Sequence, residues 1–207
     1  MTTGQGDRAK PLKCVIDAAS DGGICLSVGG GPLRISSNVT NLNIGCFQNV
    51  DVVGDAHVLP YACSVVDSIY CEAVLEHLSD PKTAVTEMYR VLKAGGKVLA
   101  VTPFLQRFHG YPYHFQNFTV VGHELLFKRA GFQVLDSGTC VGPTYAVVNL
   151  VSAYLTQCLP RLIGVPAAVI WNAAGVLLLP LDRMINLRAS SHTLASSTYV
   201  LAQKPPN

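Results

Sequence analysis

The sequence predicts an α/β protein with a doubly wound, mostly parallel sheet that is covered by helices on both faces. Three observations predict this fold. Short apolar runs with strand character alternate with helical patterns along most of the chain. The first such run ends directly in Gly29, Gly30 and Gly31. Polar and acidic residues follow the ends of the next runs, where ligands bind in sheets of this kind.

Each element follows from its periodicity and its flanking residues. Strands are expected over residues 24–28, 39–42, 50–53, 65–70, 97–102, 132–136 and 197–203, and helices over 12–19, 81–92 and 123–130. The helix over 81–92 has one apolar face and begins at Pro81, directly after Asp80, whose side chain can cap it. The glycine run is expected to open a further helix, whose free N–H groups would meet polar atoms of a ligand.

Length and composition narrow the function classes. The chain of 207 residues fits one domain over residues 1–207. Charged residues make up 14%, against about 25% in typical domains, so apolar surface is expected to be hidden in an unusual way. The net charge of +2 and the scattered basic residues argue against a nucleic-acid substrate. The seven cysteines form no C-x-x-C pair, which argues against a zinc site and a disulfide framework. A polar N-terminus without an apolar core predicts a cytoplasmic protein.

Four sequence blocks follow the glycine run of residues 25–32 at orderly spacing. They are Asn43 after a strand, Val-Val-Gly-Asp-Ala-His over 52–57, a block over 68–77 that ends in Val-Leu-Glu-His, and a block over 91–98 that contains Lys-Ala-Gly-Gly. Together they resemble the small-molecule group of class I S-adenosylmethionine-dependent methyltransferases, over about residues 13–136. The resemblance implies a Rossmann-like seven-stranded sheet with an antiparallel last strand. It also implies an enzyme that moves a methyl group from S-adenosylmethionine to a small acceptor.

The resemblance assigns the cofactor site residue by residue. Gly29, Gly30 and Gly31 would let the backbone approach the methionine part of the cofactor, and Asn43 would contact its ribose. Asp55 would accept a hydrogen bond from the adenine amino group, while the backbone N–H of Ala56 donates to a ring nitrogen. The strand end formed by Cys71 and Glu72 would lie on the sulfonium side.

The sequence departs from the family pattern at three positions. Ser27 and Asn43 stand where acids are usual, and Leu33 stands where a third glycine is common. We therefore expect weaker cofactor binding, because neutral hydrogen bonds replace charge-assisted ones. The alternative function is an inactive methyltransferase-like scaffold that binds or regulates. A nicotinamide dehydrogenase fits less well, since Arg34 replaces the glycine that its glycine motif needs.

The loop over residues 103–119 is the candidate acceptor side, because it follows a strand end and carries six aromatic residues. His109 and His114 are candidate catalytic bases for an oxygen acceptor, with Tyr111 and Tyr113 as positioning groups. The alternative is that both histidines only hold the loop together. No metal is expected there, because no Cys, Asp or Glu lies at ligand spacing from them.

An apolar helical insertion is expected over residues 144–190, between the last two strands. Arg161 is the only charged residue from 137 to 181, and two apolar helices are expected over 145–159 and 162–181. A single membrane span is not expected, because the two neighbouring strands require the chain to return to the same side. In addition, Pro166 and Pro180 would bracket a helix of only about 21 Å. Three roles stay open for the insertion over 144–181: peripheral membrane contact linked to a lipophilic acceptor, a homodimer interface, or a lid over the active site.

Overall fold

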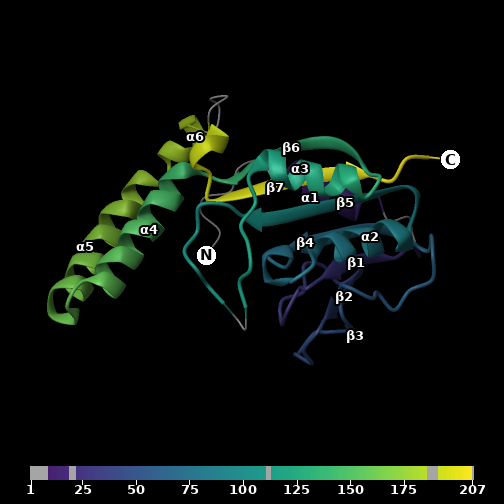
Figure 1. Ribbon diagram of the computed structural model, residues 1–207, viewed down its shortest axis with the longest axis horizontal. Coiled ribbons are helices and arrows are strands. Elements are labelled where there is room, and N and C mark those ends of the chain that lie inside the picture. The colour runs from purple at the N-terminus through teal and green to yellow at the C-terminus, as the bar shows by residue number, and fades with distance from the viewer. Residues whose placement is uncertain (1–8, 19–21, 111–112, 186–190, 207) are drawn as a thin grey trace.

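The computed structural model describes residues 9–18, 22–110, 113–185 and 191–206. A twisted sheet with packed helices forms the body of the molecule, and a pair of long helices projects from one end of it (Figure 1). We refer to the sheet with helices α1 to α3 as the body, and to the two projecting helices as the hairpin.

One sheet of seven strands runs through the body in the order β3-β2-β1-β4-β5-β7-β6. Strands β1 to β5 are parallel to their neighbours, and β7 lies antiparallel between β5 and β6. This arrangement confirms the predicted seven-stranded Rossmann-like sheet. The strands are β1 Cys25–Val28, β2 Val39–Asn43, β3 Val52–Val53, β4 Val66–Glu72, β5 Leu92–Pro103, β6 Gln133–Val141 and β7 Ser197–Gln203.

Helices cover both faces of the sheet, as predicted. Helices α2, Pro81–Val91, and α3, Val120–Arg129, pack on one face, where Met88 and Phe127 are fully buried in the larger core. Helix α1, Ala9–Ile16, packs on the other face, where Val15 joins Tyr70 and Leu99 in a smaller core. The alternation of apolar runs in the sequence therefore reflects two cores divided by one sheet.

Several element boundaries differ from the expected ones. Helix α1 begins at Ala9 and ends at Ile16, and the expected end at Ala19 lies outside the described residues. Helix α3 begins three residues early, because the Thr119 side chain accepts a hydrogen bond from the N–H of Gly122 and caps it. Strand β4 continues to Glu72, because Cys71 and Glu72 still pair with Ala100 and Val101 of β5.

The glycine run does not open a helix, so this expectation was wrong. Residues 29–38, all of them described, connect β1 to β2 through turns. The connection is only ten residues long and contains Pro32 and the turn-forming stretch 36–38, whereas a helical crossover needs about a dozen residues or more. No helix N-terminus therefore stands at this turn to offer its N–H groups.

The helical insertion before the last strand is confirmed. Helices α4, Pro143–Cys158, and α5, Arg161–Leu178, form the hairpin, and the short α6, Leu181–Ile185, follows them. Residues 186–190 of the expected insertion lie outside the described residues. Pro166 does not end a helix as expected, because it lies near the start of α5, where it removes only one backbone hydrogen bond. Helix α5 is therefore about 27 Å long at about 1.5 Å per residue, and the length argument against a span was wrong.

Candidate functional site

One cavity of about 820 Å³ opens at the carboxyl ends of β1, β2 and β4. This edge of the sheet is where the strand order reverses, the position at which doubly wound sheets bind their ligands. The cavity is lined by residues from the glycine run, from three of the four blocks that follow it and from the loop after β5, among them Gly29, Gly31, Asn43, Asp55, Ala56, Val74, His77, Tyr113 and Phe115; the block over 91–98 contributes none.

The three glycines are required for different reasons. A Cβ at Gly29 would lie 2.1 Å from the Val74 side chain, and one at Gly30 would lie 2.4 Å from the Oδ1 atom of Asn41. Close packing therefore explains these two glycines. Gly31 has a positive φ of 58° and open space beside it, so its glycine meets a backbone requirement and leaves the cavity wall bare. Gly30 does not line the cavity.

A buried asparagine holds the glycine turn in place, which the sequence analysis missed. The side-chain amide of Asn41 donates hydrogen bonds to the carbonyl groups of Gly31 and Asn49, each at 2.9 Å. Asp51 in turn accepts the backbone N–H of Asn41 at 2.8 Å and forms an ion pair with Arg34. A polar residue at an inward position of a short apolar strand was the signal that could have identified this support.

Asn43 and Asp55 both line the cavity, and each makes a local hydrogen bond. The Oδ1 atom of Asn43 accepts the N–H of Gly45 at 2.9 Å, so one acceptor position of the predicted ribose ligand is already used. The Oδ1 atom of Asp55 accepts the N–H of His57 and contacts its Nδ1 atom, both at 2.8 Å. The His57 N–H lowers the pKa of Asp55 despite partial burial, so this carboxylate is ionised at neutral pH. Its Oδ2 atom takes part in neither contact.

The end of β4 meets the cavity two residues later than predicted. Cys71 is a buried residue of β4, and its burial raises the pKa of its thiol. Neither Cys71 nor Glu72 lines the cavity. Ala73 and Val74 line it instead, and Ala73 has a positive φ of 54° that turns the chain at the strand end. The offset arises because β4 ends two residues later than expected, at Glu72.

Two of the three departures from the family pattern lie away from the cavity. Ser27 is buried, and Leu33 is 77% exposed to solvent; neither lines the cavity. Asn43 is the one departure that reaches it.

Neither candidate base, His109 nor His114, lines the main cavity. The Nδ1 atom of His114 accepts the backbone N–H of His109 at 3.2 Å, so its Nε2 atom carries the proton and donates to Asn117 at 2.6 Å. Both ring nitrogens of His114 therefore make contacts within the loop. Tyr113 lines the cavity, and Tyr111 lies outside the described residues.

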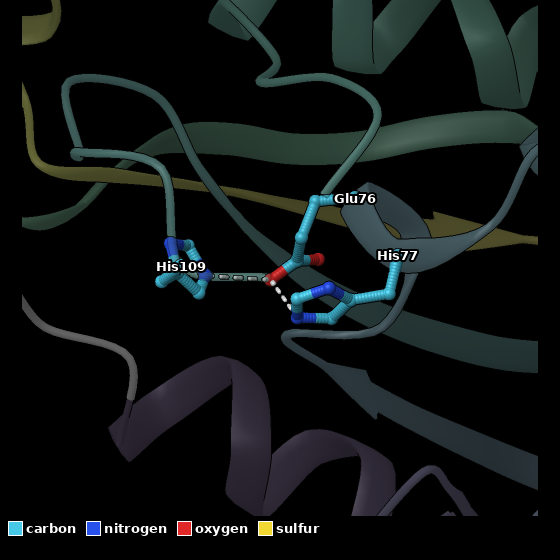
Figure 2. Close-up of side chains that lie close together, drawn as sticks. All are labelled: Glu76, His77 and His109. Atoms are coloured by element: carbon cyan, nitrogen blue, oxygen red, sulfur yellow. Dashed lines mark ion pairs between the residues drawn. The ribbon is translucent and has the colours of Figure 1, made fainter. Parts of the chain in front are cut away.

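The histidine that does reach the cavity is His77, and beside it lies Glu76, a carboxylate with no exposed surface. Both residues belong to a short 3₁₀ turn, Leu75–His77, directly after β4. Burial raises the pKa of Glu76 to about 7. His109 comes within reach of both side chains from the loop after β5 (Figure 2). Glu76, in the turn after β4, thus lies close to His109, which follows 33 residues later in the sequence. Sequence spacing could not reveal this proximity.

Residues 34–100 match the methyltransferase domain family. The matched segment begins after the glycine turn and includes Asn43, Asp55 and the Glu76–His77 pair. It agrees with the order of the blocks from which the resemblance was inferred.

Known proteins agree with this assignment. Over 80 residues the chain is 34% identical to the ubiquinone/menaquinone biosynthesis C-methyltransferase UbiE of Klebsiella pneumoniae, which covers 35% of this chain and 32% of the relative. The match thus spans about a third of that relative's length.

Two solved structures share the fold over nearly the whole chain. The (4+2)-cyclase SpnF superposes with a TM-score of 0.60 at 20% identity, covering 99% of this chain and 87% of that chain. Phosphoethanolamine N-methyltransferase 2 of Haemonchus contortus, solved with S-adenosyl-L-methionine, gives a TM-score of 0.54 at 14% identity and covers 98% of this chain and 54% of that chain. At these identities the likeness concerns the fold alone. With the family match, it confirms the predicted resemblance to class I methyltransferases, and the family match supports S-adenosylmethionine as the cofactor.

Proposed function

We propose that this protein is an S-adenosylmethionine-dependent methyltransferase that acts on a small, apolar acceptor. The observation that carries the proposal is the cavity at the reversal of strand order, which brings Gly31, Asn43 and Asp55 from three separate blocks together. Its volume lies within the usual range of about 300–1,000 Å³ for small-molecule sites.

The residues of the cavity fit the cofactor. When bound, S-adenosylmethionine supplies a methyl group on a positively charged sulfur atom. The open backbone at Gly31 leaves room for a ligand, and the ionised Asp55 has an oxygen atom available to accept a hydrogen bond from the adenine amino group. Ala56, which follows Asp55 on the cavity wall, supplies the backbone position that the family uses for the adenine ring.

Apolar side chains on the remaining wall support an apolar acceptor. Ile44, Phe47, Leu78 and Phe115 line the cavity, and Phe47 and Phe115 are each about half exposed without a ligand. Such a wall excludes water from the reacting groups once it is covered. The UbiE relative, a C-methyltransferase by name, supports a carbon atom as one class of acceptor.

Calorimetric titration with S-adenosylhomocysteine tests the cofactor half of the proposal. Asp55→Ala should weaken binding by about tenfold or more, because a charge-assisted hydrogen bond is worth about 1.5–3 kcal/mol. Asp136→Ala is the matched control, since Asp136 is an exposed carboxylate on β6 that pairs with Tyr199. Equal binding by both variants would contradict the adenine role of Asp55.

The alternative is a scaffold that binds the cofactor without turnover. The fold also occurs in a protein named as a cyclase, so the fold alone does not determine the reaction. Transfer of label from methyl-labelled S-adenosylmethionine to apolar acceptors separates the two functions. Cofactor binding without any labelled product across a broad acceptor panel would favour the scaffold.

We further propose that the hairpin holds the protein against the cytoplasmic side of a lipid bilayer. In α5 the buried residues are all small, namely Gly164, Ala168 and Gly175, whereas Leu162 and Leu177 are at least 80% exposed. Small residues inside and bulky apolar residues outside are typical of helices that pack in lipid. Within the described residues, Arg161–Leu178 is the one helix long and apolar enough to cross a membrane, and 17% of it is buried.

The polar side chains of the hairpin support the same proposal, because they find partners within it. Asn172 donates to the Ser152 hydroxyl at 3.0 Å, and the indole N–H of Trp171 donates to the carbonyl of Val148 at 3.0 Å. The Asn149 amide donates to the carbonyl of Tyr145, also at 3.0 Å. Polar groups that are satisfied internally can enter lipid at low cost.

Flotation with phospholipid vesicles tests the membrane role. The wild-type protein should float with the vesicles, and the double variant Ile170→Lys, Leu177→Lys should remain in the dense fraction. Val121→Lys is the matched control, because Val121 is an equally exposed apolar residue on α3 of the body. A monodisperse monomer that does not float, or a dimer that the double variant dissociates without any flotation, would contradict the membrane proposal.

A further inference from the structure

Three side chains that the cofactor assignment leaves unused meet beside the cavity. The Oε1 atom of Glu76 lies 3.7 Å from the Nε2 atom of His77 and 3.8 Å from the Nε2 atom of His109. All three atoms lie within 4.8 Å of one another. Figure 2 shows both imidazole rings turned toward the same carboxylate, one from the 3₁₀ turn after β4 and one from the loop after β5. We call these residues the Glu76 cluster.

The carboxylate of this cluster is buried without a hydrogen-bond partner. Glu76 has 0% of its surface exposed, and neither of its oxygens accepts a hydrogen bond from another of the described residues. An ionised group in this position is costly unless a positive charge approaches it. The two contacts with histidine, at 3.7 and 3.8 Å, are too long to serve as hydrogen bonds.

The other nitrogen of each histidine is already engaged with a backbone carbonyl. The Nδ1 atom of His77 contacts the carbonyl of Tyr113, and the Nδ1 atom of His109 contacts the carbonyl of Arg107 at 3.0 Å. Because a carbonyl only accepts, both Nδ1 atoms must carry hydrogen. In the neutral rings the Nε2 atoms therefore present lone pairs to Glu76. Backbone carbonyls commonly orient metal-binding histidines in this way.

When the histidines are neutral and Glu76 is ionised, three electron-pair donors thus converge on one point with no donor proton between them. This arrangement is repulsive by itself and becomes favourable when a cation occupies the centre. We propose that Glu76, His77 and His109 form a binding site for a divalent first-row transition metal ion such as zinc.

The distances and the ligand types fit such an ion. Zinc lies about 2.0–2.2 Å from nitrogen and carboxylate oxygen ligands, so two of its ligand atoms lie at most about 4.2 Å apart. Both contacts of Glu76, at 3.7 and 3.8 Å, satisfy this limit, and the three ligand atoms lie within 4.8 Å of one another. Two histidines and one carboxylate are a known ligand set for zinc and other transition metals, and they leave coordination positions open.

The site borders the proposed acceptor side, because His77 belongs both to the cluster and to the cavity wall. His114 is not a ligand, because its two ring nitrogens are used within the loop. The metal site goes beyond the proposed methyl transfer and does not depend on it, since metal binding can be measured without cofactor or acceptor.

Zinc titration of the full chain, followed by calorimetry and by metal analysis after dialysis, tests the site. The wild-type protein should bind one zinc ion per chain, and His77→Ala, His109→Ala and Glu76→Gln should each weaken binding by more than about tenfold, the scale on which even outer-shell partners act. The matched controls are His57→Ala and Glu124→Gln, which remove an imidazole and a carboxylate outside the cluster. Both controls should bind zinc as the wild type does.

Cobalt substitution separates this site from adventitious binding at the exposed thiols of Cys46, Cys63 and Cys158. The proposed ligands predict d–d bands without thiolate-to-cobalt charge transfer. Because His109 lies in a loop, circular dichroism of the His109→Ala variant should show an unchanged fold, while its cobalt bands should disappear. Thiolate bands, equal zinc binding by the cluster variants and the controls, or no binding by folded wild-type protein would overturn the proposal.

Discussion

Helix α2 is amphipathic and helix α5 is largely apolar, and the two helices bury opposite kinds of side chain. Helix α2 packs Ala84, Val85, Met88 and Val91 on the sheet and leaves its polar residues outside. Helix α5 buries Gly164, Ala168 and Gly175 against α4 and leaves its large residues outside. The burial of large apolar side chains away from water therefore stabilises the body, whereas close contact between two helix backbones stabilises the hairpin.

The largest expected difference between the two helices concerns deletion of a large side chain. Met88→Ala should lower the free energy of unfolding of the body by about 2–5 kcal/mol, because it leaves a cavity among fully buried neighbours. Ile170→Ala, on the 71% exposed position of α5, should change it by less than about 0.5 kcal/mol in water. Urea unfolding followed by far-ultraviolet circular dichroism measures both values.

The comparison fails if Ile170→Ala lowers the free energy of unfolding as much as Met88→Ala does. In that case Ile170 would be covered in solution, by a second subunit or by the rest of the chain, and the hairpin would pack like the body. Repeating the experiment at several protein concentrations would identify a second subunit, because dimer stability depends on concentration.

The second prediction concerns the addition of side-chain volume between α4 and α5, whereas the first concerns its removal. At Gly164 a Cβ would lie 2.0 Å from the backbone carbonyl oxygen of Leu155, so α4 and α5 must separate to accept it. Gly164→Val should therefore destabilise the hairpin by about 1–3 kcal/mol. Trp171 is the only tryptophan and contacts α4 through its indole N–H, so its fluorescence reports the hairpin directly.

Ala173→Val is the control for this substitution, because Ala173 is exposed on the same helix. It places the same branched side chain on α5 without touching α4 at the Gly164 contact, so the Trp171 signal should keep its wild-type midpoint. Helix propensity alone would favour Gly164→Val slightly and disfavour Ala173→Val, because valine ranks between glycine and alanine. Equal effects of the two substitutions would therefore contradict the role of the close contact.

The order of the sheet could be predicted from the sequence because apolar runs, glycine turns and helix caps are local signals. The cap of α2 by Asp80 and the antiparallel strand β7 are examples. The prediction that failed, a helix after the glycine run, also relied on a local signal, but that signal was ambiguous. The glycine run reads equally well as a helix start and as a turn, and the partner that decides, Asn41, comes ten residues after Gly31.

The candidate site was predictable on its cofactor side and less so on its acceptor side. Gly31, Asn43 and Asp55 each follow a strand, and parallel strands bring their ends to one edge. The Glu76 cluster depends instead on how a loop of 16 residues, 104–119, folds back over the sheet. The choice between His77, His109 and His114 as the residue nearest the cavity is a tertiary property that spacing does not contain.

The third prediction concerns the base of the hairpin, where a charged side chain caps a helix. The buried carboxylate of Asp182 accepts the N–H groups of Thr144 at 2.8 Å and Tyr145 at 3.3 Å, and so caps α4 from α6. Asp182→Ala should destabilise the hairpin by about 0.5–2 kcal/mol, in the range of a lost helix cap. Thermal unfolding followed by Trp171 fluorescence measures the loss.

Asp182→Asn separates capping from packing at this position. Its amide oxygen can still accept one of the two N–H groups, so the loss should be smaller than in Asp182→Ala. An asparagine variant that is as unstable as the alanine variant would show that charge, and not the hydrogen bond alone, holds α4 to α6.

The smallest expected effect distinguishes the two regions by their response to acid. Burial alone would raise the pKa of Asp67, but the Lys93 ammonium at 2.7 Å and the Ile24 N–H at 2.8 Å outweigh it and hold that pKa below its usual range. A carboxyl group with a lowered pKa in the folded state stabilises the fold fully above its unfolded pKa of about 3.9 and loses this contribution as the pH falls through the folded pKa. Asp67→Asn should thus lower the stability of the body at pH 7 by at most about 1 kcal/mol, since Lys93 is half exposed.

The difference between wild type and Asp67→Asn should shrink below about pH 4, where the wild-type carboxyl group begins to bind its proton. Other carboxylates titrate alike in both proteins and cancel in this difference. The hairpin should not share the effect, because Arg161 is the only charged residue of α4 and α5 and it does not lose its charge in this range. A difference that stays constant from pH 7 to pH 3 would contradict the stabilising role of the Asp67 charge. A Trp171 midpoint that moves with the Asp67 substitution would show that the body and the hairpin unfold as one unit.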